Sequence, residues 1–312
     1  MRRTVLAALL CATLACAGCA GLRRDRAEAF RVVGYAPDYS LDRTDPAAFG
    51  RVTDAILFSV EPTPDGAFPA EALAAAPVAR FQEIRRAHGV RVHLCFGGWG
   101  RSAGFPPMAT DPAKRAAFIT DLDAFCREKG FDGVDYDWEF PATPGEHAAY
   151  NALLIETARA LHPQGKEVTV ALGWSQTLDP AAYAAVDRIH LMTYDMGARH
   201  ATHEAATAAV RRLIRDGAPK GKICLGLPFY GRKMDHPDTA AAYADLLRDH
   251  APAPAQDEAG GFYFNNADTL RRKTRYALEE GLAGVMIWEL SMDTRDDTSL
   301  LKAITDEIAR LR

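Results

Sequence analysis

The sequence predicts an α/β protein with a (β/α)8 TIM-barrel fold, formed as one domain by residues 30–312. From residue 30 onward, short apolar runs rich in β-branched residues alternate with longer segments of helical periodicity. Continuous apolar strands that alternate with helices are typical of a parallel sheet covered on both faces. The chain holds eight such units in about 280 residues, which is the number that closes a (β/α)8 barrel.

The predicted strands follow one another along the chain, with helical segments between them. In order, the strands are residues 30–35, 54–60, 90–98, 131–140, 168–174, 188–195, 222–231 and 284–290. The clearest helical patterns are residues 112–130, 147–163, 203–217 and 267–281. Three of these patterns stop at a glycine, the residue that most often follows the last turn of a helix.

Residues 233–262 show the weakest pattern. They contain one helical stretch, 238–250, then a linker rich in Pro and Ala, and they end at an apolar FYF. Only about fifty residues separate the seventh and eighth strands, too few for a further domain, so we expect no α+β insertion between them. A doubly wound open sheet is the alternative fold, but no Gly-rich phosphate-binding turn follows the first strand to support it.

The N-terminal segment has the layout of an export signal. Arg2 and Arg3 precede a short apolar run that ends in small residues before Cys19. Such a run is too short to cross a membrane, and we predict a signal peptide over residues 1–18. The residues CAGC resemble a bacterial lipobox, with Cys where Leu is usual. We therefore expect lipidation of Cys19, a tether over residues 19–29 and a place in the cell envelope, at the outer membrane or surface. Secretion without a lipid anchor is the alternative.

The composition is that of an ordinary globular protein, with 48% hydrophobic and 25% charged residues and a net charge of −4. No basic patch with interleaved aromatic residues is present, so we do not expect a nucleic acid partner. Beyond the signal and tether the cysteines are Cys95, Cys126 and Cys224, an odd number without close spacing. We expect buried free thiols, with one disulfide as the alternative. We also expect a monomer without a cofactor.

Residues 132–140, DGVDYDWEF, combine acids with strand-forming residues. Because strand side chains alternate, Asp135, Asp137 and Glu139 share one face, which in a barrel is the lumen, while the apolar residues between them pack under the helices. Neighbouring acids in that row stand roughly 6 to 7 Å apart along the backbone. Like charges this close cannot all ionise cheaply, so one carboxyl should hold its proton near neutral pH.

Glu139 falls at the C-terminal end of its strand, the face that carries the active site in such barrels. This place suits a general acid, with Asp137 and Asp135 behind it holding the proton and tuning its pKa. An exposed acidic loop is one alternative, but it would not explain the apolar residues between the acids. A Ca²⁺ or Mg²⁺ site is another, but three acids along one strand do not encircle an ion well. His200 and His203 lack a third metal ligand at suitable spacing.

The acidic segment resembles the D-x-x-D-x-D-x-E signature of glycoside hydrolase family 18, the chitinase-like family. Asp132, Asp135, Asp137 and Glu139 fill every acidic position, on the fourth predicted strand, where that family carries the motif. Other segments are similar to family motifs: LCFGGW (94–99), with Cys95 where Ser is usual, LMTYDM (191–196), LGLPFYGR (225–232), GVMIWEL (284–290) and, in part, VGY (33–35).

The resemblance implies hydrolysis of β-1,4-linked N-acetylglucosamine polymers or oligosaccharides by a retaining, substrate-assisted mechanism. Glu139 would be the general acid and base. The substrate's own acetamido carbonyl would attack the anomeric carbon, while Asp137 orients the acetamido N–H and Asp135 supports it. Tyr194 would hydrogen-bond the acetamido oxygen, and Asp195 would help to hold the distorted sugar.

The resemblance also suggests which residues bind the sugar. Flat apolar faces of pyranose rings stack on aromatic rings, so aromatic residues at strand ends are candidates. The predicted substrate-binding residues are Trp288, Trp99, Tyr35, Met192, Phe58, Tyr230 and Arg232, and Asp132, Gly97 and Gly98 are expected to be structural.

Two other functions remain open at this point. An endo-β-N-acetylglucosaminidase that cuts N-glycan cores would carry the same acidic motif. A catalytically inactive, lectin-like sugar-binding protein is less favoured, because such relatives commonly lack the terminal acid and Glu139 is intact. Without the α+β insertion, we expect a shallow groove that favours internal cleavage or short oligosaccharides.

Overall fold

The structure, a computed structural model, describes residues 30–69, 75–253 and 255–312. The predicted signal peptide, the tether and Cys19 lie outside the described residues. Residues 31–312 form one compact unit. In the described part of the chain, no helix has the length and apolar character that crossing a membrane requires.

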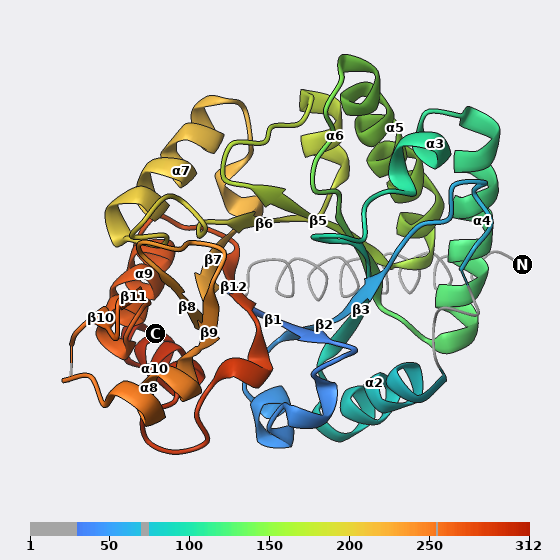
Figure 1. Ribbon diagram of the computed structural model, residues 1–312. Helices are drawn as coiled ribbons and strands as arrows, with labels where there is room; N and C mark the ends of the chain where they lie inside the picture. The colour runs from blue at the N-terminus through green and yellow to red at the C-terminus, as the bar shows by residue number, and fades with distance from the viewer. Residues whose placement is uncertain (1–29, 70–74, 254) are drawn as a thin grey trace, which may run out of the picture. The chain divides into compact units, whose positions relative to one another are not determined.

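Eight parallel strands close into a barrel in the order β1-β12-β7-β6-β5-β4-β3-β2, which confirms the predicted (β/α)8 fold. Figure 1 shows the strands at the centre and the helices in a ring around them. The barrel strands are β1 (Arg31–Pro37), β2 (Asp54–Val60), β3 (Arg91–Gly97), β4 (Gly133–Asp137), β5 (Glu167–Gly173), β6 (Arg188–Met192), β7 (Ile223–Pro228) and β12 (Gly284–Trp288).

The helices follow the strands, as in other barrels of this kind. They are α2 (Ala75–His88), α3 (Phe105–Ala109), α4 (Pro112–Lys129), α5 (Pro144–Leu161), α6 (Pro180–Ala185), α7 (His203–Arg215), α9 (Ala267–Glu279) and α10 (Leu300–Leu311). In the described residues, five short 3-10 turns lie in the connections between strands and helices: η1 (Leu41–Arg43), η2 (Pro46–Gly50), η3 (His162–Gln164), η4 (Lys220–Lys222) and η5 (Leu290–Met292).

Local sequence explains where these helices begin and end. In α4, the Asp111 side chain accepts hydrogen bonds from the backbone N–H groups of Ala113 and Lys114, and Pro112 occupies the first turn, where no N–H partner is needed. The helix ends at Gly130, whose φ of 72° lies in the left-handed region that glycine adopts without strain.

The segment between β7 and β12 is more ordered than the sequence suggested. We expected no α+β insertion here, only one helix over 238–250 and a linker. The structure instead has an antiparallel sheet in the order β10-β11-β8-β9, and the helix α8 begins only at Tyr243 because Ala240–Ala242 pair with β8. The elements are β8 (Tyr230–Lys233), β9 (Ala240–Ala242), α8 (Tyr243–His250), β10 (Glu258–Ala259) and β11 (Phe262–Tyr263).

Strand β4 follows the alternation that its sequence predicts. Tyr136 points outward and shares a hydrogen bond with Thr157 of α5 at 3.0 Å. Trp138, just past the strand, stacks on Phe105 of α3 with ring centroids 5.0 Å apart. Asp135 and Asp137, which alternate with them along the chain, therefore face the lumen of the barrel. Cys95, Cys126 and Cys224 are all free thiols and buried, as expected.

Candidate active site

Asp135, Asp137 and Glu139, which we call the acidic row, lie along the C-terminal half of β4 and just past its end, beside the end of β3. In the register of these strands, Asp135 lies opposite Cys95 and Asp137 lies opposite Gly97. Gly97 and Gly98 allow this close approach: a Cβ on Gly97 would lie 2.2 Å from the Asp137 carbonyl oxygen, and the N–H of Gly98 donates to the same oxygen at 2.6 Å. The two glycines are therefore structural, and they hold the row in place.

Asp135 is fully buried, and both oxygens of its carboxylate accept hydrogen bonds. The hydroxyls of Tyr35 and Thr169 each donate to its carboxylate at 2.6 Å, and Nδ1 of His190 lies 3.2 Å from it. Burial alone would raise the pKa of Asp135, but His190 and the two hydroxyls outweigh burial and hold the pKa below its ordinary value. Asp135 is therefore the ionised member of the row.

Asp137 has the opposite environment. It is buried, and its Oδ1 has no hydrogen-bond partner among the residues that the structure describes. Burial, followed by the negative charges of Glu139 and Asp135, raises the pKa of Asp137 well above the ordinary value. The environment of Asp137 therefore favours the protonated carboxyl, as the spacing of the acids led us to expect for one of them.

Glu139 lies just past the strand, at the rim. Its backbone N–H donates to the Ser102 hydroxyl at 3.1 Å, which fixes the chain at this point. Burial and then the charge of Asp195 raise the pKa of Glu139 to about 7, while a hydrogen bond from the Trp99 backbone acts in the other direction. A carboxyl with this pKa can both give and take a proton near neutral pH, which is what a general acid and base must do.

A second network faces the acidic row from β6 and β8. The carboxylate of Asp195 accepts hydrogen bonds from the Tyr230 hydroxyl at 2.7 Å and from Arg232, also at 2.7 Å through one nitrogen. Burial would raise the pKa of Asp195, but hydrogen bonds from His200, Arg232 and Tyr230 hold it well below the ordinary range. Asp195 is therefore a fixed negative charge.

Three predicted substrate-binding residues form a packed aromatic cluster. The rings of Phe58 and Trp288 meet edge to face with their centroids 4.6 Å apart. The ring centroid of Tyr35 lies 5.6 Å from that of Trp288. Met192 packs against the same cluster, as does Tyr194, whose hydroxyl makes a long contact of 3.8 Å to the sulfur of Met286. Of these residues, Trp288 and Met192 retain some exposed surface.

Two of the predicted sugar platforms need correction. Tyr35 is 1% exposed and its hydroxyl is bonded to Asp135, so it offers no open ring face. Tyr230 is also buried, and its hydroxyl is bonded to Asp195. Both tyrosines instead position carboxylates. Trp99, by contrast, is 80% exposed at the rim.

Asp132 lies away from the row, before the start of β4. Arg85 donates two hydrogen bonds of 2.9 Å to its carboxylate, and the N–H of Val92 donates a third at 3.0 Å. These bonds tie α2 and β3 to the beginning of β4, which agrees with the structural place that we expected for Asp132.

The sequence did not point to several residues of the site. Thr169 lies directly opposite Asp135 in the register of β4 and β5, so strand alternation could have found it. His190 lies two residues before Met192 on β6 and shares its inward face by the same rule. Ser102 lies in a loop, where no periodicity applies, and nothing in the sequence marks it.

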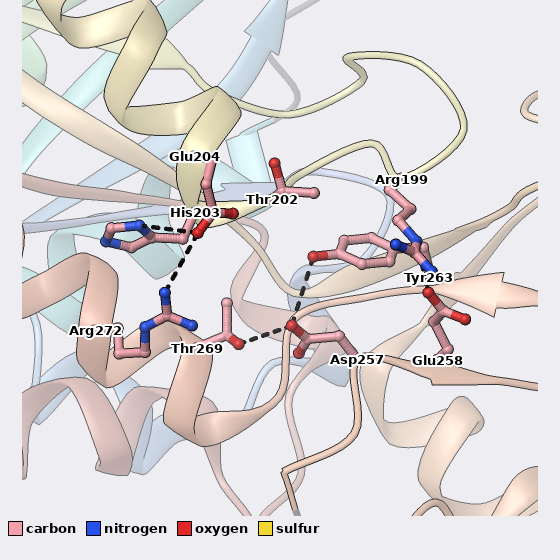
Figure 2. A pocket seen from close by; sticks show the side chains of 9 residues that line it. All are labelled: Arg199, Thr202, His203, Glu204, Asp257, Glu258, Tyr263, Thr269 and Arg272. Atoms are coloured by element: carbon pink, nitrogen blue, oxygen red, sulfur yellow. Dashed lines mark hydrogen bonds and ion pairs between the residues drawn. The ribbon is translucent and has the colours of Figure 1, made fainter.

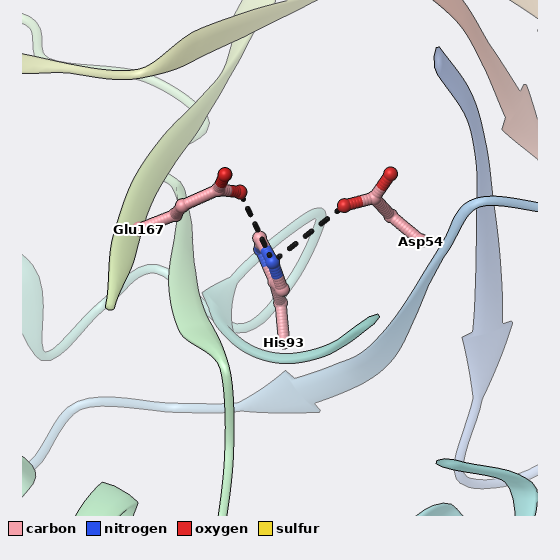
Figure 3. A group of neighbouring side chains, drawn as sticks. All are labelled: Asp54, His93 and Glu167. Carbon is pink, nitrogen blue, oxygen red and sulfur yellow. Dashed lines mark ion pairs between the residues drawn. The ribbon is translucent and has the colours of Figure 1, made fainter. Parts of the chain in front are cut away.

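One cluster of side chains has the spacing of a metal site. Asp54, His93 and Glu167 each bring one ligand atom within 4.8 Å of the others at the end of the barrel where strands begin (Figure 3). Arg188 donates to both carboxylates, and two further arginines pair with Asp54 at 3.8 and 3.1 Å. Three guanidinium groups already exceed two carboxylates in charge, so we interpret the group as an ion cluster that closes this end of the barrel.

A polar pocket of about 280 Å³ lies among the start of α7, the start of α9 and the small sheet (Figure 2). Its charges are paired: Arg199 lies 2.7 Å from Glu258, and Arg272 lies 3.5 Å from Glu204. His203 lines this pocket, whereas His200 contacts Asp195 at 3.4 Å. The two histidines therefore do not share a site, and the pocket contains none of the residues that we predicted to be catalytic.

The comparisons with known proteins agree with this geometry. The model of the family "Glycosyl hydrolases family 18" matches residues 31–293. Endochitinase 1 of Metarhizium robertsii is 26% identical, over 70% of this chain and 65% of its own length. Chitinase A1 of Niallia circulans is 27% identical, over 64% of this chain and 40% of its own length. The chain thus spans less than two thirds of the length of these relatives.

Solved structures resemble this one over most of its length. A GH18 chitinase from the chitin utilization locus of Flavobacterium johnsoniae has a TM-score of 0.80 and 25% identity, and the match covers 91% of this chain and 95% of that one. A chitinase from Bacteroides thetaiotaomicron has a TM-score of 0.77 at 24% identity, with 89% and 96% covered, and shows the same fold.

Proposed function

The chain belongs to the glycosyl hydrolases family 18, and from this we propose that it hydrolyses β-1,4-linked N-acetylglucosamine polymers or oligosaccharides, with retention at the anomeric carbon. One observation carries the proposal. Asp137 lies directly behind Glu139; it is buried, its pKa is raised well above the ordinary value, and its Oδ1 has no partner among the described residues, while the pKa of Glu139 is raised to about 7. This pair has the properties that substrate-assisted hydrolysis requires.

In the proposed first step, Glu139 gives its proton to the glycosidic oxygen. As the bond between that oxygen and the anomeric carbon breaks, the acetamido carbonyl oxygen of the same sugar attacks the carbon from the other face. The product is a cyclic oxazolinium ion, so no carboxylate nucleophile is needed. The free Oδ1 of Asp137 accepts the acetamido N–H, which is the hydrogen bond that this oxygen lacks without substrate.

In the second step, Glu139 takes a proton from a water molecule, which opens the oxazolinium ion and restores the acetamido group. The Tyr194 hydroxyl, whose contact with Met286 is long, is free to donate to the acetamido oxygen. Burial raises the pKa of Glu139 most, and the negative charge of Asp195, fixed by Tyr230 and Arg232, raises it further. Trp288 supports the apolar face of the reacting sugar.

The test is to assay the wild-type protein and the variants Glu139→Gln and Asp137→Asn on chitin oligosaccharides and on an N-glycosylated protein. We expect the wild type to cleave the oligosaccharides and both variants to lose most of this activity while still binding them. Release of glycan without cleavage of chitin oligosaccharides would favour an endo-β-N-acetylglucosaminidase. Binding without turnover by the wild type would refute both enzyme functions.

We also propose that the protein is exported and held at the cell envelope through Cys19. The support is the order of basic residues, apolar run and lipobox-like CAGC in the sequence. Radioactive palmitate should label the wild type in cells but not a Cys19→Ser variant, and only the wild type should fractionate with membranes. Equal labelling of both proteins would refute the anchor.

A further inference from the structure

Exposed aromatic rings gather on one rim of the barrel. In the described part of the chain, the exposed large apolar side chains are Tyr39, Trp99, Phe140, Trp174 and Leu311. The four aromatic ones follow the C-terminal ends of β1, β3, β4 and β5, whereas Leu311 ends α10. Large exposed apolar groups collected in one place mark binding surfaces, and these four lie at the end of the barrel that carries Glu139.

Phe140 and Trp174 form a pair on this rim. Phe140 is the residue after Glu139, so it lies directly beside the proposed acid. Its ring lies against Gly173 at the end of β5, where an added Cβ would come within 2.9 Å of the ring. Trp174 is the next residue, and each of the two rings is 45% exposed.

The backbone at Trp174 is held from two sides. Arg212 of α7 donates to the carbonyl oxygens of Trp174 and Ser175 at 3.1 and 2.9 Å. Gln176 accepts the N–H of Gly173 at 2.6 Å and donates to the Trp138 carbonyl at 3.3 Å, which joins this turn to the segment that carries Glu139. A backbone fixed in this way loses little conformational entropy when the side chain that it carries binds a ligand.

The order of strands places this pair across the barrel mouth from Trp288. In the closed barrel, β12 and β4 are separated by four steps in either direction. The acid contacts the oxygen that joins the reacting sugar to the leaving group. If the reacting sugar lies over Trp288, the sugars beyond the cleaved bond extend toward the opposite side, over Phe140 and Trp174.

We propose that Phe140 and Trp174 form a platform for the N-acetylglucosamine residues on the leaving-group side of the cleaved bond. The apolar faces of these sugars stack on the two rings, and the stacking makes longer oligosaccharides better substrates than short ones. The inference rests on the proposed function, because it specifies how the same site selects the length of its substrate. Binding energy from parts of a substrate remote from the reacting bond contributes to its kcat/KM.

The experiment compares kcat/KM for chitohexaose with kcat/KM for 4-nitrophenyl chitobioside, which has no sugar beyond the cleaved bond. In Trp174→Ala the ratio of the two values should fall roughly three- to tenfold, the size of one lost aromatic contact. Leu311→Ala removes an exposed apolar side chain far along the sequence, on α10, and should leave the ratio as in the wild type. Thermal unfolding of each variant checks that it is folded.

Each outcome distinguishes the platform from the underlying function. A wild type that cleaves neither substrate refutes the proposed function, and the platform with it. A wild type that cleaves both, with an unchanged ratio in Trp174→Ala, refutes the platform alone. An equal loss on both substrates also refutes it, because Trp174 would then act on the structure of the site and not on the leaving-group sugars.

Discussion

Replacement of Glu139 by glutamine should stabilise the protein at alkaline pH and not at acidic pH. In the folded chain, burial and the charge of Asp195 raise the pKa of Glu139 from 4.5 to about 7. The unfolded chain ionises this group near its ordinary pKa. Below about pH 4 the group is neutral in both states and its raised pKa has no effect on stability.

The sign follows from the number of bound protons. Between pH 4.5 and about 7 the folded state holds a proton that the unfolded state has released, so the folded state loses stability as pH rises. Above about pH 7 the full cost is present. A rise of about 2.5 in pKa corresponds to about 3 kcal/mol at 1.36 kcal/mol for each unit. Glutamine is never charged, so the variant should avoid this cost.

The assay is urea unfolding of wild type and Glu139→Gln at pH 4 and pH 8. We expect the free energy of unfolding to be higher for the variant by up to about 3 kcal/mol at pH 8, and to be nearly equal for the two proteins at pH 4. Glu279→Gln, at an exposed position of α9, is the matched control and should show no difference at either pH. The same stabilisation at both pH values would refute the reasoning, because the gain would then come from packing.

Three further predictions concern charged and hydrogen-bonding side chains in the same barrel. The kcat/KM of the wild type should fall as pH rises through about 7, because the acid must be protonated, and Asp195→Asn should move this fall to lower pH, because the charge that raises the pKa of Glu139 is lost. Arg188→Met should lower the free energy of unfolding in urea by about 3 to 5 kcal/mol, because it leaves the buried Asp54 and the partly buried Glu167 without a main partner. In Cys95→Ser a stronger donor faces Asp135, and we expect kcat/KM to rise by less than about threefold.

The sequence predicted the parts of this structure that depend on periodicity. Alternating apolar and acidic residues placed Asp135 and Asp137 in the lumen and Tyr136 under α5. Helical periodicity, with caps such as Asp111, placed the long helices. These features are set by residues near one another in the chain, so they can be predicted without knowing how distant strands pair.

The sequence could not predict features that depend on contacts between distant strands. Tyr35 was expected to offer an open ring, but the stagger of the strands places it below the rim, where it bonds Asp135. The contact of His190 with the same carboxylate joins β6 to β4 across the lumen. The small sheet has strands of only two to four residues, which are too short to show an alternating pattern.

Among the described residues, the carboxyl groups that close one end of the barrel are paired with basic side chains, whereas Asp137 at the other end is not. At one end, Asp54 and Glu167 are matched by arginines, so their charge is satisfied within the described chain. At the other end, no basic side chain is bonded to Asp137 among the described residues; its pKa is raised well above the ordinary value, and one of its oxygens has no partner there. An unsatisfied buried oxygen is costly, and a ligand that supplies an N–H there removes the cost. A sugar with an acetamido group supplies both this N–H and the carbonyl nucleophile of the proposed mechanism, and a sugar with only hydroxyl groups cannot supply both, which is a physical reason why this end of the barrel should select N-acetylated substrates.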